Sequence, residues 1–89
     1  MPGTITYYAV IADNRTIENP YGLVRRLEHD DGPSDESMRT DFSWAGSPLI
    51  AEWERGGIGH ELVEVTHAQA SKIIRYFRMK WAYGEPLDP

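Results

Sequence analysis

The sequence predicts one small α+β domain spanning residues 1–89, in which an antiparallel sheet of three or four strands packs on a C-terminal amphipathic helix. Three observations predict it. Runs rich in β-branched and aromatic residues occur early in the chain, apolar residues recur at helical spacing near its end, and 89 residues suffice for one domain but not for two. With 40% hydrophobic and 26% charged residues, the composition is that of a globular protein.

The first two strands are predicted from residue type. Residues 4–12 are dominated by β-branched and aromatic side chains, and both of their alternating sets are apolar, as is typical of a strand covered on two faces. Residues 22–28 are expected to pair antiparallel with this strand. Residues 29–37 hold acids, glycine and proline and are expected to form a loop. Residues 38–44 fit a helix and a strand equally well.

Residues 47–56 allow two alternatives. Ser47 suits a helix N-cap, Pro48 the first helical position and Gly56 the position after a helix end. These signals favour a second short helix at 48–55. The alternation of apolar residues with two glutamates inside the segment favours a strand instead. We expect the helix, because three signals that are specific to position agree.

The final helix is the element with the strongest signals. A short strand is expected at 60–65, and Thr66 with Gln69 then forms a capping box at the start of the helix. The apolar stripe of this helix consists of Ala70, Ile73, Ile74, Phe77 and Trp81. The basic residues on its opposite side are Lys72, Arg75 and Arg78.

Composition and charge exclude several classes of function. The chain has no cysteine, so disulfides, thiolate metal sites and a cysteine nucleophile are excluded. No segment approaches the roughly 20 apolar residues of a membrane span, and the first residues lack the features of a signal peptide. We therefore expect a cytoplasmic protein with no membrane partner. Residues 1–66 hold 12 acids and five bases, which argues against duplex nucleic acid as the main partner.

The histidines form no known catalytic or metal-binding motif. His60 and His67 are seven residues apart, whereas a zinc-protease helix carries two histidines four residues apart. We expect no catalytic residue, no metal site and no cofactor. The alternative function is a small ligand-binding or acid–base enzyme domain that uses His60 or His67 together with Glu61 or Glu64.

Aromatic residues provide the main functional signal. Trp44 and Trp53 lie in polar surroundings, and tryptophan is enriched at binding hot spots. Because one C-terminal helix covers only one face of a small sheet, Tyr8 and Val10 are expected to need cover from another element. If 48–55 were a strand, they would form an apolar patch suited to a homodimer; a helix there, or the 38–46 segment, would instead cover them.

The sequence therefore predicts a non-catalytic protein-interaction or regulatory module. Its candidate binding residues are Tyr8, Val10, Trp44 and Trp53, and its expected occupant is a protein partner or a second copy. A third hypothesis, weak nucleic-acid binding, depends on the basic face of the final helix.

Overall fold

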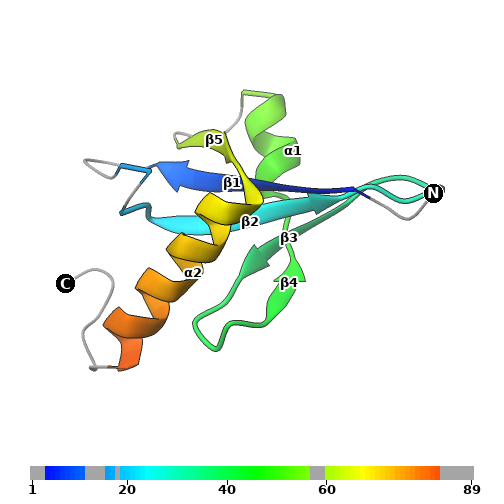
Figure 1. Ribbon diagram of the computed structural model, residues 1–89. Helices are drawn as coiled ribbons and strands as arrows, with labels where there is room; N and C mark the ends of the chain where they lie inside the picture. The colour runs from blue at the N-terminus through cyan, green and yellow to red at the C-terminus, as the bar shows by residue number, and fades with distance from the viewer. Residues whose placement is uncertain (1–3, 12–15, 18, 57–59, 83–89) are drawn as a thin grey trace.

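The sheet and its two helices are shown in Figure 1. The computed structural model describes residues 4–11, 16, 17, 19–56 and 60–82. Within these residues the elements are, in chain order, β1 (Ile5–Ile11), β2 (Gly22–Leu27), β3 (Ser34–Met38), β4 (Trp44–Gly46), α1 (Leu49–Glu54), β5 (Glu61–Val65) and α2 (His67–Ala82).

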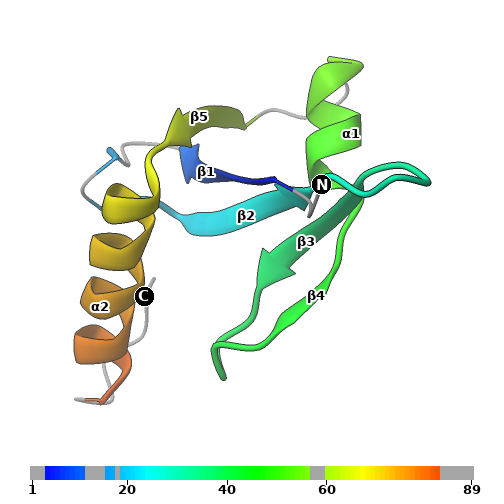
Figure 2. The ribbon, with the colours of Figure 1, turned by 45° about the vertical axis from the view of Figure 1, so that its right-hand side comes forward.

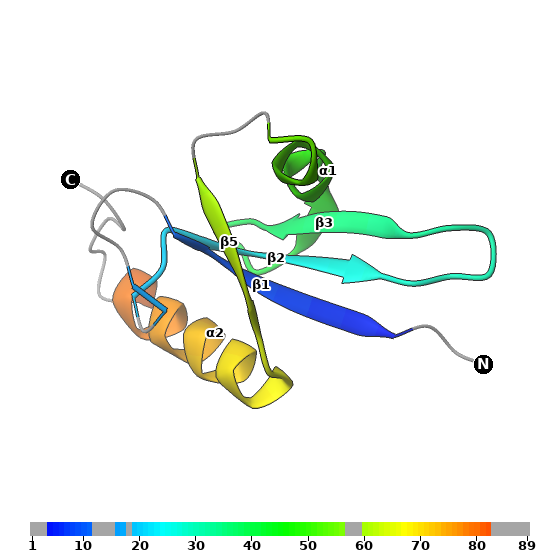
Figure 3. The same cartoon turned by 90° about the horizontal axis from the view of Figure 1, so that it is seen from above.

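The strands lie in the order β4-β3-β2-β1-β5, and every neighbouring pair is antiparallel. Figure 3 shows α1 and α2 on opposite faces of this sheet. Each helix covers its own cluster of buried apolar side chains. The predicted fold class is confirmed, with five strands in place of three or four. Neither helix is long and apolar enough to cross a membrane.

The additional strand is β3. The expectation of a loop over 29–37 is wrong for its second half, because Ser34–Met38 pairs with β2. These residues lack the β-branched and aromatic types that indicate a strand. Two arginines of β2 provide the stabilisation instead, since each faces an acidic residue of β3 and forms an ion pair with it. The pairs are Arg25 with Glu36 and Arg26 with Asp35.

Residues 38–44 contain the turn that joins β3 to β4. The backbone N–H of Arg39 donates to the carbonyl oxygen of Ser43 at 2.8 Å. The carboxylate of Asp41 accepts hydrogen bonds from the backbone N–H (3.0 Å) and the hydroxyl (2.6 Å) of Ser43. These hydrogen bonds hold the pKa of Asp41 below its ordinary value. Phe42, at the tip, has a φ of 68°, a left-handed conformation that bulky residues rarely adopt.

The helix expected at 48–55 is confirmed by α1, but it begins one residue later than predicted. Pro48, expected at the first helical position, is the N-cap, and Ser47, expected as the N-cap, lies just before it. The backbone N–H of Leu49 donates to the hydroxyl of Ser47 at 3.2 Å. Gly56, just beyond the helix, has a φ of 75°, as glycine does at many helix C-termini. Ile50 is 1% exposed and attaches α1 to the sheet. The residues at the two ends of the segment and the burial of Ile50 therefore both favour a helix here.

Gly56→Ala is expected to lower the free energy of unfolding by about 1 kcal/mol, because alanine adopts positive φ values at a cost that glycine avoids. An added methyl group at Gly56 meets no heavy atom within 4 Å beyond its chain neighbours, so the cost is conformational. Urea unfolding followed by circular dichroism measures the change. Gly46→Ala is the control, because its methyl group is equally unobstructed and its φ is not positive. Equal losses in the two variants would contradict this explanation.

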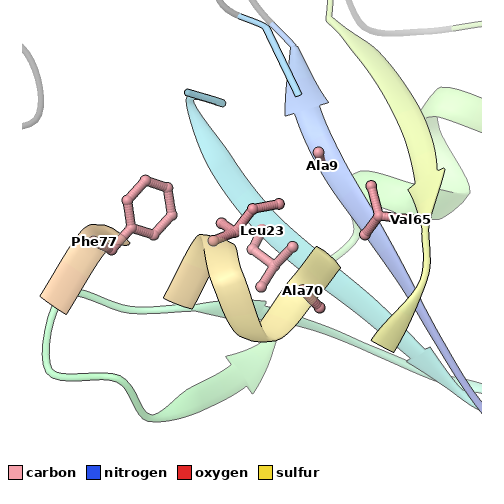
Figure 4. Close-up of a cluster of buried hydrophobic side chains, with 6 residues drawn as sticks. Ala9, Leu23, Val65, Ala70 and Phe77 are labelled. Atoms are coloured by element: carbon pink, nitrogen blue, oxygen red, sulfur yellow. The ribbon is translucent and has the colours of Figure 1, made fainter. Parts of the chain in front are cut away.

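α2 begins with the predicted capping box. The N–H of Gln69 donates to Thr66 Oγ1 at 3.0 Å, and the N–H of Thr66 donates to Gln69 Oε1 at 2.8 Å. The helix then packs on the sheet through one buried cluster, part of which is shown in Figure 4: Ala9, Leu23, Val65, Ala70, Ile73 and Phe77. Three residues of the predicted stripe are thus buried, and Ile74 is half-buried. The side chain of Trp81 lies outside the described part of the chain.

Candidate functional site

The predicted binding residues lie on two opposite faces of the sheet and do not form one site. Tyr8, Val10 and Trp53 lie on the face covered by α1, and Trp44 lies on the face covered by α2. Val10 is 3% exposed, so it belongs to the core beneath α1. α1 also covers the face that a strand at 48–55 would leave open to a second copy.

Tyr8 and Trp53 attach α1 to the sheet. Their ring centroids lie 6.1 Å apart, with the ring planes tilted by 54°. Both side chains are half-buried. Burial, followed by the negative charge of Glu64, raises the pKa of Tyr8 above its ordinary value. The phenol of Tyr8 therefore remains neutral over the ordinary pH range, as suits a residue that packs against an aromatic ring.

Arg26 joins three elements on the α1 face. Its Nε and Nη2 donate to the two carboxylate oxygens of Asp35 on β3, at 2.7 and 3.0 Å. Its Nη1 and Nη2 donate to the carboxylate of Glu54 on α1, at 2.9 and 3.2 Å. The hydrogen bonds to Asp35, and then those to Glu54, raise the pKa of the guanidinium above its already high value. This arrangement, the Arg26 clamp, binds β2, β3 and α1 together.

Trp44 is the centre of a cluster of an aromatic ring and a guanidinium group on the other face. The Cζ atom of Arg25 lies 4.0 Å from the centroid of the Trp44 ring, and the ring centroid of Tyr7 lies 6.1 Å from that of Trp44. Glu36 holds the guanidinium of Arg25, accepting a hydrogen bond from Nε at 2.8 Å and lying 2.7 Å from Nη2. Strand register explains the arrangement, because Tyr7 pairs with Arg25 and Arg25 pairs with Glu36. Tyr7, Arg25 and Trp44, all half-buried, are named here the Trp44 platform.

A groove of about 350 Å³ runs along α2 and is lined by Ser71, Ile74, Arg75 and Arg78. The Cζ atom of Arg78 lies 4.9 Å from the centroid of the Phe42 ring, so this side of α2 faces the tip of the β3–β4 hairpin. Figure 2 shows that the β3–β4 hairpin and α2 both extend to the same side of the molecule, away from β1 and β5. Ile74, Phe42 and Trp44 all pack at the edge of the buried cluster beneath α2. The groove and the Trp44 platform therefore border the same buried cluster.

Three basic residues of α2 line two different hollows. Arg75 and Arg78 line the groove described above. Lys72 instead lines a separate hollow of about 300 Å³, together with Ile17, Gln69 and Ile73. Lys72, Arg75 and Arg78 follow one another at three-residue spacing, so they remain neighbours on the surface of the helix, but only the two arginines are among the described residues that line the groove.

The two histidines of the acid–base alternative do not share a site. His67 and Glu64 both line an open hollow of about 580 Å³ where β1 begins and β5 ends. His67 Nε2 lies 2.9 Å from the carbonyl oxygen of Ile5. His60 lies beside Tyr21, with the ring centroids 5.9 Å apart. Among the described residues, no group of three or more histidines, cysteines, aspartates and glutamates is placed to hold a metal ion.

The residues around Trp44 were not predicted from sequence. Tyr7 and Arg25 lie in segments that were correctly predicted to pair, so the exact register of that hairpin would have placed them side by side. Glu36 required the recognition of β3, for which its own segment gives no signal.

Comparison of the chain with known proteins gives no match among protein-family models, curated proteins or solved structures. Its function is therefore inferred from its own geometry and chemistry.

Proposed function

We propose that the protein is a non-catalytic, cytoplasmic interaction module, a regulator or accessory subunit, that binds a protein partner through the Trp44 platform. The observation that carries this proposal is the packing of Trp44 against both Tyr7 and Arg25. Tryptophan, tyrosine and arginine are the residue types most enriched at binding hot spots. In this protein the three types are adjacent on one face, each with part of its surface open to solvent.

The platform is ordered before a partner binds. Glu36 restrains the guanidinium of Arg25 through hydrogen bonding, and that guanidinium lies over the ring of Trp44. Immobilising a flexible side chain on binding costs about 0.5–1.5 kcal/mol, and a side chain that is already restrained avoids part of this cost. This restraint supports a role of the Trp44 platform in recognition, in addition to the exposed surface that its three side chains offer to a partner.

The α1 face offers less to a partner. Val10 is buried there, and Tyr8 with Trp53 already packs against α1. The guanidinium of Arg26 is engaged by two carboxylates. Of the predicted binding residues, Trp44 is thus the one that we place in the interaction surface.

Trp44→Ala is expected to weaken partner binding by at least about 30-fold, the loss that corresponds to a hot-spot residue worth about 2 kcal/mol. The tagged full chain, incubated with lysate of its native source, captures the partner, and the purified partner is then titrated by calorimetry. Trp53→Ala is the matched control, because it removes the same half-buried side chain from the opposite face.

Thermal unfolding establishes that both variants are folded at the temperature of the titration. Equal weakening by the two substitutions would show that the α2 face is not the specific contact. Full binding by Trp44→Ala would remove the platform from the interaction surface. Sedimentation over a range of concentrations tests a second copy as the occupant, since a constant monomer mass excludes it.

A further inference from the structure

The charge of α2 is opposite to that of the rest of the chain. Residues 67–82 hold four basic residues and no acidic residue, whereas the remaining residues hold all 14 acids and five bases. In a chain of net charge −5, α2 is therefore an isolated cationic element. Charges that are segregated in this way attract an anionic partner to one element and repel it from the others.

Arg75 and Arg78 place this charge in the groove. Both side chains are exposed, and among the described residues ion pairs are formed by Arg25 and Arg26 but not by these two. Arg78 lies over the ring of Phe42. A guanidinium over an aromatic ring keeps N–H donors in its own plane, and these match a carboxylate in a bidentate arrangement.

We propose that the groove binds an acidic segment of a partner protein, with carboxylates on Arg75 and Arg78 and an apolar side chain against Ile74 and the Trp44 platform. This inference rests on the proposed function and specifies the chemistry of the partner. The apolar side chain is included because Ile74 and Trp44 border the same buried cluster and both retain exposed surface.

A peptide fits these observations better than a nucleic acid does. Among the described residues, two basic side chains line the groove, since Lys72 lines a different hollow. Nucleic-acid affinity depends on neutralising many phosphates, and an acidic body repels a polyanion as it approaches. Two guanidinium groups suffice for the carboxylates of a short segment.

The inference is tested by fluorescence anisotropy with the full chain and a labelled synthetic peptide in which glutamates alternate with leucines. We expect binding that weakens as salt rises. Arg75→Glu and Arg78→Glu are each expected to weaken it on the order of tenfold. Lys72→Glu makes the same change of charge at a residue that lines a different hollow, and it is expected to weaken binding less than either arginine variant does. Arg75→Gln removes the positive charge without introducing a negative one. Its circular dichroism spectrum shows whether the variant is folded, so that a loss of binding is distinguished from a loss of folding.

Four results would overturn the inference in different ways. Equal weakening by Lys72→Glu and Arg75→Glu would show that the field of the whole helix attracts the peptide. Equally tight binding of a glutamate–serine peptide would remove the contribution of Ile74 and Trp44. Tighter binding of a labelled duplex oligonucleotide would favour nucleic acid. A partner whose binding depends on Trp44 but not on Arg75 would overturn this inference and support the proposed function. A partner whose binding depends on Arg75 but not on Trp44 would overturn the proposed function, and with it the contact to the Trp44 platform.

Discussion

Phe77→Ala is expected to lower the free energy of unfolding by about 3–5 kcal/mol. Phe77 is 1% exposed, and its ring is among the largest fully buried side chains. It packs between α2 and the sheet in the cluster shown in Figure 4. Removing the ring leaves a cavity that this cluster fills only in part. Because a domain of this length has a total stability of about 4–13 kcal/mol, the loss brings the variant close to unfolding.

Urea unfolding followed by circular dichroism measures this loss, and Met79→Ala is the control. Met79 lies two residues further along α2 and is 58% exposed, so its truncation is expected to change the free energy of unfolding by less than about 0.5 kcal/mol. Similar values for the two variants would show that α2 is not held by its buried side. If the free energy of unfolding of Phe77→Ala fell less steeply with urea concentration than that of the unchanged protein, α2 would already have separated from the sheet in the variant.

Arg26→Met is expected to lower the free energy of unfolding by about 2–3 kcal/mol. The substitution removes all four hydrogen bonds of the Arg26 clamp while retaining much of the length of the side chain. The carboxylate of Asp35, whose side chain is 14% exposed, is then left close to that of Glu54 without a cation between them. The cost therefore combines lost hydrogen bonds with repulsion between the partly buried carboxylate of Asp35 and the exposed carboxylate of Glu54.

Two further variants identify the origin of this effect. Arg26→Lys keeps the charge but lacks the planar fork that reaches both carboxylates, so its loss is expected to be intermediate. Adding Asp35→Asn to Arg26→Met should recover part of the stability, as residues in one network do in a double-mutant cycle. Arg55→Met removes an exposed arginine from the end of α1 and serves as the control. A loss in Arg26→Met no larger than that in Arg55→Met would show that the clamp contributes nothing.

The elements that were predicted correctly are those whose signals are local. The capping box of Thr66 and Gln69 lies within four consecutive residues, and the repeat that follows it specifies α2. The helix at α1 is indicated by Ser47 and Gly56 at its two ends. β3 was missed because residues 34–38 are typical of a loop, and what stabilises them as a strand is the pair of arginines on β2.

The candidate site was predicted only in part, because the face that a residue occupies depends on distant elements. Trp44 and Trp53 have similar surroundings in the sequence, yet they lie on opposite faces of the sheet. Val10 was a candidate because nothing in its own segment shows that α1 covers it. Arg25 gains its place beside Trp44 from the pairing of three strands, which residue type alone does not specify.

The strand order has a consequence for how the chain folds. β1 to β4 pair in sequence as successive hairpins, whereas β5 pairs with β1 although about 50 residues separate the two strands in the chain. Pairing strands so far apart carries the larger entropic cost. The four-stranded meander is therefore expected to form first. Until β5 arrives, one edge of β1 has no neighbouring strand, and the apolar face that later receives α2 is open to water. This interval is the one in which aggregation competes with folding.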